Sequence, residues 1–151
     1  MEEPRVWTFF YGSYINFDVH RDLGVDAERW EMARLLGWEI VIRPHANLVR
    51  SEGGVVYGIV ATMTHAELDR LYRHAREVLG ETYVPEAVLV DTLDGRWRPA
   101  LCYISWEMAP GPAQNGYVDR IVGAGRAFGF PAWYLEHLDA MRQGPPGEPP
   151  N

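Results

Sequence analysis

A short loop near the N-terminus has the residue types of an anion-binding site. The strand-like segment Thr8–Phe10 is followed directly by Tyr11, Gly12 and Ser13. Glycine adopts positive φ without steric cost and lets the backbone approach a ligand closely. The first amides of a following helix or turn have no internal acceptor and bind carboxylates or phosphates. The sequence therefore predicts an anion cradle at this loop, with an ordinary structural turn as the alternative.

Other catalytic patterns are weaker. Ser13 follows a glycine, but no second glycine completes the G-x-S-x-G motif of a nucleophile elbow. A serine hydrolase would also need a histidine beside the Ser13 hydroxyl, and His20 and His45 are the candidates. The five histidines form no HExxH pattern and the one cysteine forms no CxxC pair, which argues against a metal site. Neither GxGxxG nor GxxxxGK[ST] is present, so a nucleotide cofactor is unsupported.

The charge composition excludes several kinds of partner and mechanism. The net charge is −7, and all 14 basic residues are arginine. An acidic chain is poorly suited to binding nucleic acid, and the absence of lysine excludes a Schiff-base or P-loop lysine mechanism. The sequence has no run of 18 apolar residues, so it predicts no membrane-spanning segment. The acidic N-terminus is unlike a signal peptide, and one cysteine allows no internal disulfide, so we expect a cytoplasmic protein.

Three local signals indicate where elements begin and turn. Thr64, with Glu67 three residues later, is typical of a capping box at a helix start. The pair Asp94-Gly95 between two β-rich runs predicts a hairpin. Pro131 lies where a proline is favoured at the start of the last helix.

The order of the elements predicts an α+β domain. We expect a small mixed β-barrel or sheet with flanking helices, formed as a single domain by residues 1–142, and a disordered Pro/Gly-rich tail at 143–151. The expected strands are Val6–Phe10, Trp38–Ile42, Val55–Thr62, Tyr83–Val90 and Trp97–Ser105. The expected helices are a short one ending at Leu23, one after Thr64 that ends at Gly80, Tyr117–Phe128 and Ala132–Met141.

Several of these segments together resemble one known family. They are Tyr11-Gly12-Ser13 after the first strand, the aromatic–glycine strand Val56–Val60, the hairpin from Tyr83 to Tyr103, and the closing segments 117–125 and 129–138. In order and spacing this set resembles the γ-glutamylcyclotransferase (AIG2-like) family over residues 5 to 142.

The resemblance implies a fold, a reaction and a site. The fold is a small barrel with a cavity at one end, where backbone amides bind the α-carboxylate of a γ-glutamyl group. The substrate α-amine attacks its own γ-carbonyl, which releases 5-oxoproline and an amine without any cofactor. A general base must first deprotonate the α-ammonium, and the intramolecular geometry supplies much of the rate advantage.

Residues carried over by position form the expected substrate site. Tyr14 stands where the family often has asparagine, and Asn16 is a polar group two residues later. The implied substrate-binding residues are Tyr11, Gly12, Ser13, Tyr14, Ile15, Asn16, Tyr83 and Tyr103.

The general base is the point at which this chain departs from the family. The family has a glutamate shortly after a Leu-Asp-type helix, whereas residues 72–76 of this chain contain no acid. Glu81 and Glu77 are the candidate catalytic residues. Glu81, just past Gly80, is preferred, because helical spacing places Glu77 near Arg73 in an ion pair. His74 is a third candidate base.

Two functions remain open at this point. The first is an enzyme that acts on a γ-glutamyl amine, amino acid or peptide; the second is a non-catalytic member of the same fold that binds a small anionic metabolite. Both predict a small-molecule partner, no nucleic acid, no membrane, and a monomer or weak homodimer.

Overall fold

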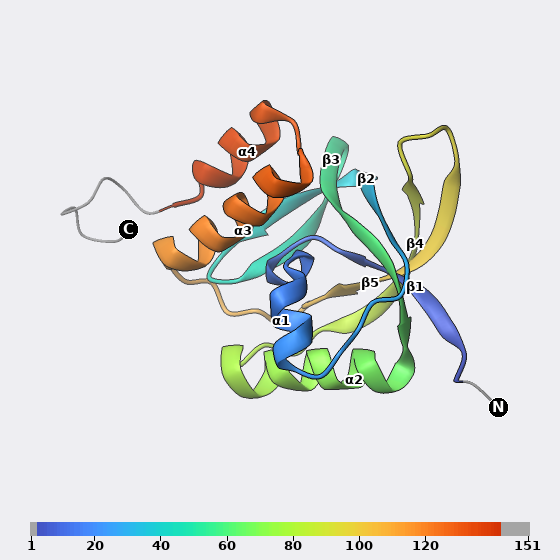
Figure 1. Ribbon diagram of the computed structural model, residues 1–151. Coiled ribbons are helices and arrows are strands. Elements are labelled where there is room, and N and C mark those ends of the chain that lie inside the picture. The colour runs from blue at the N-terminus through green and yellow to red at the C-terminus, as the bar shows by residue number, and fades with distance from the viewer. Residues whose placement is uncertain (1–2, 143–151) are drawn as a thin grey trace.

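The computed structural model describes residues 3–142, so the tail predicted to be disordered lies outside the described residues. Five strands form the centre of the molecule (Figure 1). They are β1 (Arg5–Phe10), β2 (Trp30–Ile42), β3 (Ala46–Thr64), β4 (Val84–Asp91) and β5 (Trp97–Ile104). The helical elements are η1 (Ser13–Ile15), α1 (Phe17–Asp22), α2 (His65–His74), the π-helical turn η2 (Ala75–Leu79), α3 (Asn115–Phe128) and α4 (Ala132–Asp139).

The strands close into a barrel in the order β1-β3-β2-β4-β5. The β1–β5 pair is parallel and the other pairs are antiparallel. The seam between β2 and β4 is narrow: its one register pair is Arg34 with Asp91, whose side chains also form an ion pair of 2.7 Å. The predicted α+β class, a small mixed barrel with flanking helices, is confirmed.

The strands β2 and β3 are much longer than the sequence predicted. The predicted runs 38–42 and 55–62 are only parts of strands of 13 and 19 residues. Gly37 and Gly53 both adopt positive φ, and the pairing register shifts between Leu36 and Trp38. A glycine inside a strand often marks a bulge, and these two glycines interrupt the sequence pattern without ending either strand.

The helix α2 begins as predicted and ends in a special turn. Glu67 N–H donates to Thr64 Oγ1 at 3.0 Å and Thr64 N–H donates to Glu67 Oε1 at 2.9 Å, which confirms the capping box. The face that carries Leu68 and Leu71 packs into the core. After η2, Gly80 at φ 74° ends the helical segment and redirects the chain.

The C-terminal helices pack against each other and cover one side of the barrel (Figure 1). A Cβ at Gly125 would lie 2.7 Å from Phe130 Cδ2, so this glycine permits close packing of α3 against Phe130. Gly123, in contrast, has open space around it. Gly129 ends α3 at φ 84°.

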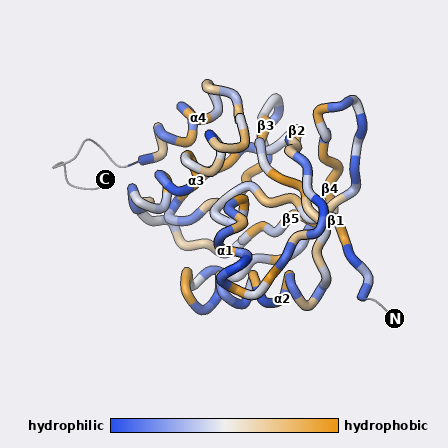
Figure 2. The backbone as a smooth tube through the Cα atoms, viewed as in Figure 1, coloured by the Kyte–Doolittle hydropathy of each residue, from blue (hydrophilic) through white to orange (hydrophobic). Residues whose placement is uncertain are grey.

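The core lies inside the barrel and beneath the helices. Hydrophobic positions follow the strands, and colour alternates along α2 as expected for an amphipathic helix (Figure 2). Cys102 on β5 is fully buried opposite Phe9 of β1, and burial raises the pKa of its thiol. No helix within residues 3–142 is long and apolar enough to cross a membrane.

Candidate functional site

A small hollow lies where β1 ends and the Tyr11–Ser13 loop begins. Its volume is about 30 Å³, room for about two water molecules. Strands, helices and loops that are far apart in the sequence contribute to its wall, and six of the lining residues are tyrosines. The lining residues are Phe10, Tyr11, Gly12, Ser13, Tyr14, Ala46, Tyr72, Leu79, Tyr83, Tyr103 and Tyr117.

The loop presents amides that the fold does not use. Ile15 N–H donates to Gly12 O and Asn16 N–H donates to Ser13 O. Among the hydrogen bonds of the described residues, none has the amide of Gly12, Ser13 or Tyr14 as its donor. These are the first amides of a short 3₁₀ turn, which lack internal acceptors. Three neighbouring N–H groups are therefore available at the edge of the hollow.

The predicted reason for glycine in this loop is wrong in one respect. Gly12 has φ −110° and ψ −135°, so no positive φ is required. The close approach is made by the protein itself, because a Cβ at Gly12 would lie 2.6 Å from Ala46 Cβ. Gly12 is needed so that the loop can pass over the first residue of β3.

Tyrosine hydroxyls connect the loop to the start of β3. Tyr83 OH donates to Ala46 O at 2.7 Å, and Tyr117 OH accepts from Ala46 N–H at 2.9 Å. The nearby Ser13 side chain favours the ionised form of Tyr117 and so opposes the effect of burial on its pKa. Burial raises the pKa of both phenols, so they stay neutral and act as hydrogen-bonding groups.

Further tyrosines fix the opposite wall. Tyr11 OH donates to Tyr103 O at 2.7 Å, and Tyr14 OH donates to Leu71 O at 2.7 Å. The rings of Tyr72 and Tyr103 stack with centroids 3.8 Å apart and planes 10° apart. The hollow therefore has an aromatic wall with backbone amides at one edge.

Glu81 lies close to Tyr83 and Tyr117 and does not itself line the hollow. It follows Gly80, and its side chain is 12% exposed. Its Oε1 is 3.8 Å from His45 Nδ1, too far for a hydrogen bond, and its Oε2 is buried with no hydrogen-bond partner among the described residues. Burial is the main cause of the raised pKa values of Tyr83 and Tyr117, and the charge of Glu81 contributes in the same direction.

His45 is the residue that faces this carboxylate. Its ring packs edge-on against Tyr117 with centroids 5.3 Å apart. Burial lowers the pKa of His45, and the charge of Glu81 opposes that effect. A neutral imidazole and an unpaired carboxylate oxygen are therefore placed side by side next to Tyr117.

The other candidate bases lie in different surroundings. Glu77 is exposed on η2, and its predicted ion pair is wrong because Arg73 pairs with Asp69 one turn earlier instead. His74 Nδ1 lies 3.1 Å from Tyr14 OH, behind a lining residue. Neither Glu77 nor His74 lines the hollow.

Two residues of the predicted substrate loop serve the fold. Ile15 is fully buried in the core. Asn16 caps α1, where its Oδ1 accepts from Asp18 N–H at 2.9 Å. Neither lines the hollow, so we do not include them in the proposed site.

The histidines considered for a serine hydrolase are engaged elsewhere. His20 Nε2 lies 2.8 Å from Tyr14 O, and His45 faces Glu81. In the described part of the chain neither forms a hydrogen bond with Ser13. Within residues 3–142 no group of three or more His, Cys, Asp or Glu side chains is arranged to hold a metal ion.

Sequence reasoning missed part of the wall. Tyr72 lies four residues after the buried Leu68, on the same side of α2, so helical spacing is the signal that could have found this tyrosine. Tyr117, Ala46 and His45 carry no comparable signal, because only the closure of the barrel brings them to the loop.

Comparison with known proteins identifies the family. The family described as "Gamma-glutamyl cyclotransferase, AIG2-like" matches residues 8–121. The chain belongs to this family. No curated protein sequence is similar enough to count as a match.

Solved structures share the family fold. An uncharacterized protein from Homo sapiens has a TM-score of 0.75 at 23% identity, over 97% of this chain and 94% of that chain. A γ-glutamyl cyclotransferase has a TM-score of 0.77 at 22% identity, over 96% and 93%. A γ-glutamyl cyclotransferase specific to glutathione from yeast has a TM-score of 0.60 at 15% identity, over 93% and 96%.

Proposed function

We propose that the protein releases 5-oxoproline from a γ-glutamyl amine, amino acid or peptide. The α-carboxylate of the substrate binds the free amides of Gly12, Ser13 and Tyr14, and Glu81 is the general base. The observation that carries the proposal is the buried Oε2 of Glu81, which has no hydrogen-bond partner among the described residues and lies close to Tyr83 and Tyr117.

The proposed reaction needs one acid–base group. Glu81 takes a proton from the α-ammonium, and the freed amine forms a C–N bond with the γ-carbonyl carbon. Glu81 gives this proton to the leaving nitrogen as the bond from the γ-carbon to that nitrogen breaks. Glu81 then carries the second proton of the ring nitrogen to the released amine, so the lactam is neutral and the amine departs as an ammonium. A positioned acid–base group contributes about 10²- to 10⁴-fold to such a step.

Substrate entry requires the wall to move. A γ-glutamyl group is larger than a hollow of about 30 Å³. Tyr83 is a half-buried lining residue close to Glu81, so it is the side chain whose displacement exposes Glu81 to the substrate. Catalytic hydrogen bonds are often long in a free enzyme and tighten only in the complex.

The first prediction tests the general base. Glu81→Gln keeps the size of the side chain and removes its basicity, so we expect kcat to fall about 10²- to 10⁴-fold with little change in ligand affinity. Release of 5-oxoproline from a panel of γ-glutamyl compounds is the measurement. Glu77→Gln, an exposed glutamate four residues earlier, is the matched control and should retain full activity.

Equal activity of the Glu81→Gln variant and the unmodified protein would contradict the assignment of the base. The alternative function, a non-catalytic domain that binds a small anionic metabolite, is favoured by the position of Glu81 outside the lining of the hollow. Binding of a γ-glutamyl compound without any 5-oxoproline release would establish that alternative.

A further inference from the structure

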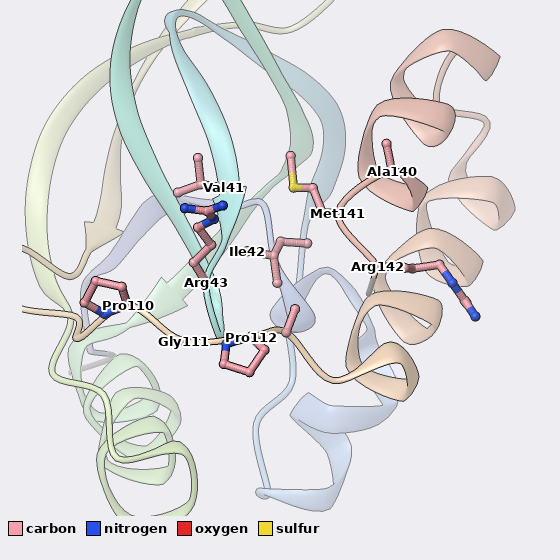
Figure 3. A pocket seen from close by; sticks show the side chains of 10 residues that line it. Val41, Ile42, Arg43, Pro110, Gly111, Pro112, Ala140, Met141 and Arg142 are labelled. Carbon is pink, nitrogen blue, oxygen red and sulfur yellow. The ribbon is translucent and has the colours of Figure 1, made fainter. Parts of the chain in front are cut away.

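A second and larger hollow opens beside the end of β2 (Figure 3). Its volume is about 540 Å³, and most of its lining is apolar. The walls come from the end of β2, the loop before α3 and the residues that follow α4. The lining residues are Val41, Ile42, Arg43, Pro110, Gly111, Pro112, Ala113, Ala140, Met141 and Arg142.

The two charged groups in this groove differ in their partners. Arg142 pairs with Asp119 and Asp139. Arg43 is exposed, and its guanidinium has no ion pair or hydrogen bond with any side chain of residues 3–142. Among the residues that the structure describes, no acidic side chain lines the groove. In a protein of net charge −7, the groove is therefore a local site of uncompensated positive charge.

The groove is adjacent to the small hollow. Ile42 lines the groove, Ala46 lines the hollow, and the two are cross-strand partners at the β2–β3 turn. Antiparallel partners have Cα atoms about 4.5 to 5.5 Å apart. One extended residue of a peptide spans about 3.5 Å, so a leaving group of one or two residues is long enough to pass from one side of the Ile42–Ala46 pair to the other.

We propose that the groove is the leaving-group subsite and selects substrates whose leaving amine carries a carboxylate, which pairs with Arg43. The substrates are then γ-glutamyl amino acids or short peptides rather than simple amines. The inference rests on the proposed function, because it assigns the second half of the same substrate. A guanidinium is well suited to this task, since its planar donors match a carboxylate in two parallel hydrogen bonds.

The test compares each substrate with an analogue that differs only in charge. γ-Glutamyl-alanine and γ-glutamyl-alanyl-glycine are each measured against their C-terminal carboxamides, for turnover and for binding by calorimetry. We expect a preference of about 10- to 100-fold for one of the carboxylates, mainly in KM, since the lost interaction is a charge-assisted hydrogen bond. Arg43→Gln should abolish that preference and leave the carboxamides unaffected.

Arg126→Gln is the matched control, because it makes the same change in net charge at an exposed arginine outside both hollows. Loss of the preference in both variants, or in neither, would overturn the subsite. Arg43-dependent binding without 5-oxoproline release would support the subsite and overturn the proposed reaction. Turnover with no preference for the carboxylates would support the proposed reaction and overturn the subsite.

Discussion

Gly12 lies where the loop after β1 comes closest to the first residue of β3. The contact with Ala46 leaves no room for a side chain, and the φ of Gly12, −110°, is negative. Glycine is therefore required at position 12 for a steric reason, and this requirement depends on the residue at position 46. The same backbone holds the free amides of the proposed carboxylate site, so a small displacement here affects stability and binding together.

The paired positions predict a compensation. Gly12→Ala should lower the free energy of unfolding by about 1–3 kcal/mol, the usual cost of overpacking, and Gly12→Val should also abolish ligand binding. Adding Ala46→Gly to Gly12→Ala should restore part of the loss, because it removes the contacting Cβ. Urea unfolding of the unmodified protein, Gly12→Ala, Ala46→Gly and the double variant measures the coupling free energy between the two positions. Additive losses would show that the contact is not the cause.

At the scale of elements, the segment from α2 to Glu81 positions the proposed base. The capping box fixes the start of α2, and Gly80 at positive φ ends η2 and directs the next residue inward. A Cβ at Gly80 meets no atom within 4 Å. The backbone conformation alone therefore requires glycine at this position.

A matched pair of glycines separates positioning from stability. Gly80 has φ 74° and Gly95, in the β4–β5 turn, has φ 87°; neither has a neighbour that a Cβ would touch. Alanine at either position should cost about 1–2 kcal/mol of unfolding free energy. Only Gly80→Ala should also reduce 5-oxoproline release, because it shifts Glu81. An equal effect of both variants on activity would contradict the positioning role.

At the scale of the whole molecule, the buried His20 and the half-buried His45 set the acid sensitivity. Burial lowers the pKa of His20 and of His45. The unfolded chain therefore binds more protons than the folded protein just below the ordinary histidine pKa of about 6.5. The stability from these two neutral rings is fully present above that pH and is lost as the pH falls below it. For Glu67 burial raises the pKa but its hydrogen bonds outweigh this, so the pKa is lowered and its contribution is lost only at more acidic pH.

The expected stability profile has two acid steps. The urea midpoint should be constant from pH 8 to about pH 7, fall below about pH 6.5 as the histidines protonate, and fall again near pH 4 as carboxylates protonate. His45→Gln should reduce the first step and leave the second unchanged. A profile without any fall between pH 7 and pH 5 would contradict the burial of both rings.

Local signals predicted the fold well where a few residues decide an element. The capping box at Thr64, the hairpin at Asp94-Gly95 and the glycine that ends η2 all have local causes. The full lengths of β2 and β3 were missed, because Gly37 and Gly53 interrupt the pattern while cross-strand pairing continues past them.

The site was predictable only in part for a related reason. The loop at Gly12 and the position of Glu81 after Gly80 are features of the local sequence. Tyr117 and His45 reach the hollow through contacts between segments about 70 residues apart, such as the bond from Ala46 N–H to Tyr117 OH. Contacts of this kind depend on the closed barrel and have no signature in either segment alone.

Cys102 gives the molecule an internal reporter of its own opening. The thiol is sealed on β5 between β1 and β4, and its raised pKa keeps it in the unreactive protonated form. An alkylating reagent therefore reacts only with molecules whose barrel has parted. The labelling rate therefore reports how often the barrel opens, and a ligand that holds the aromatic wall in place lowers this rate.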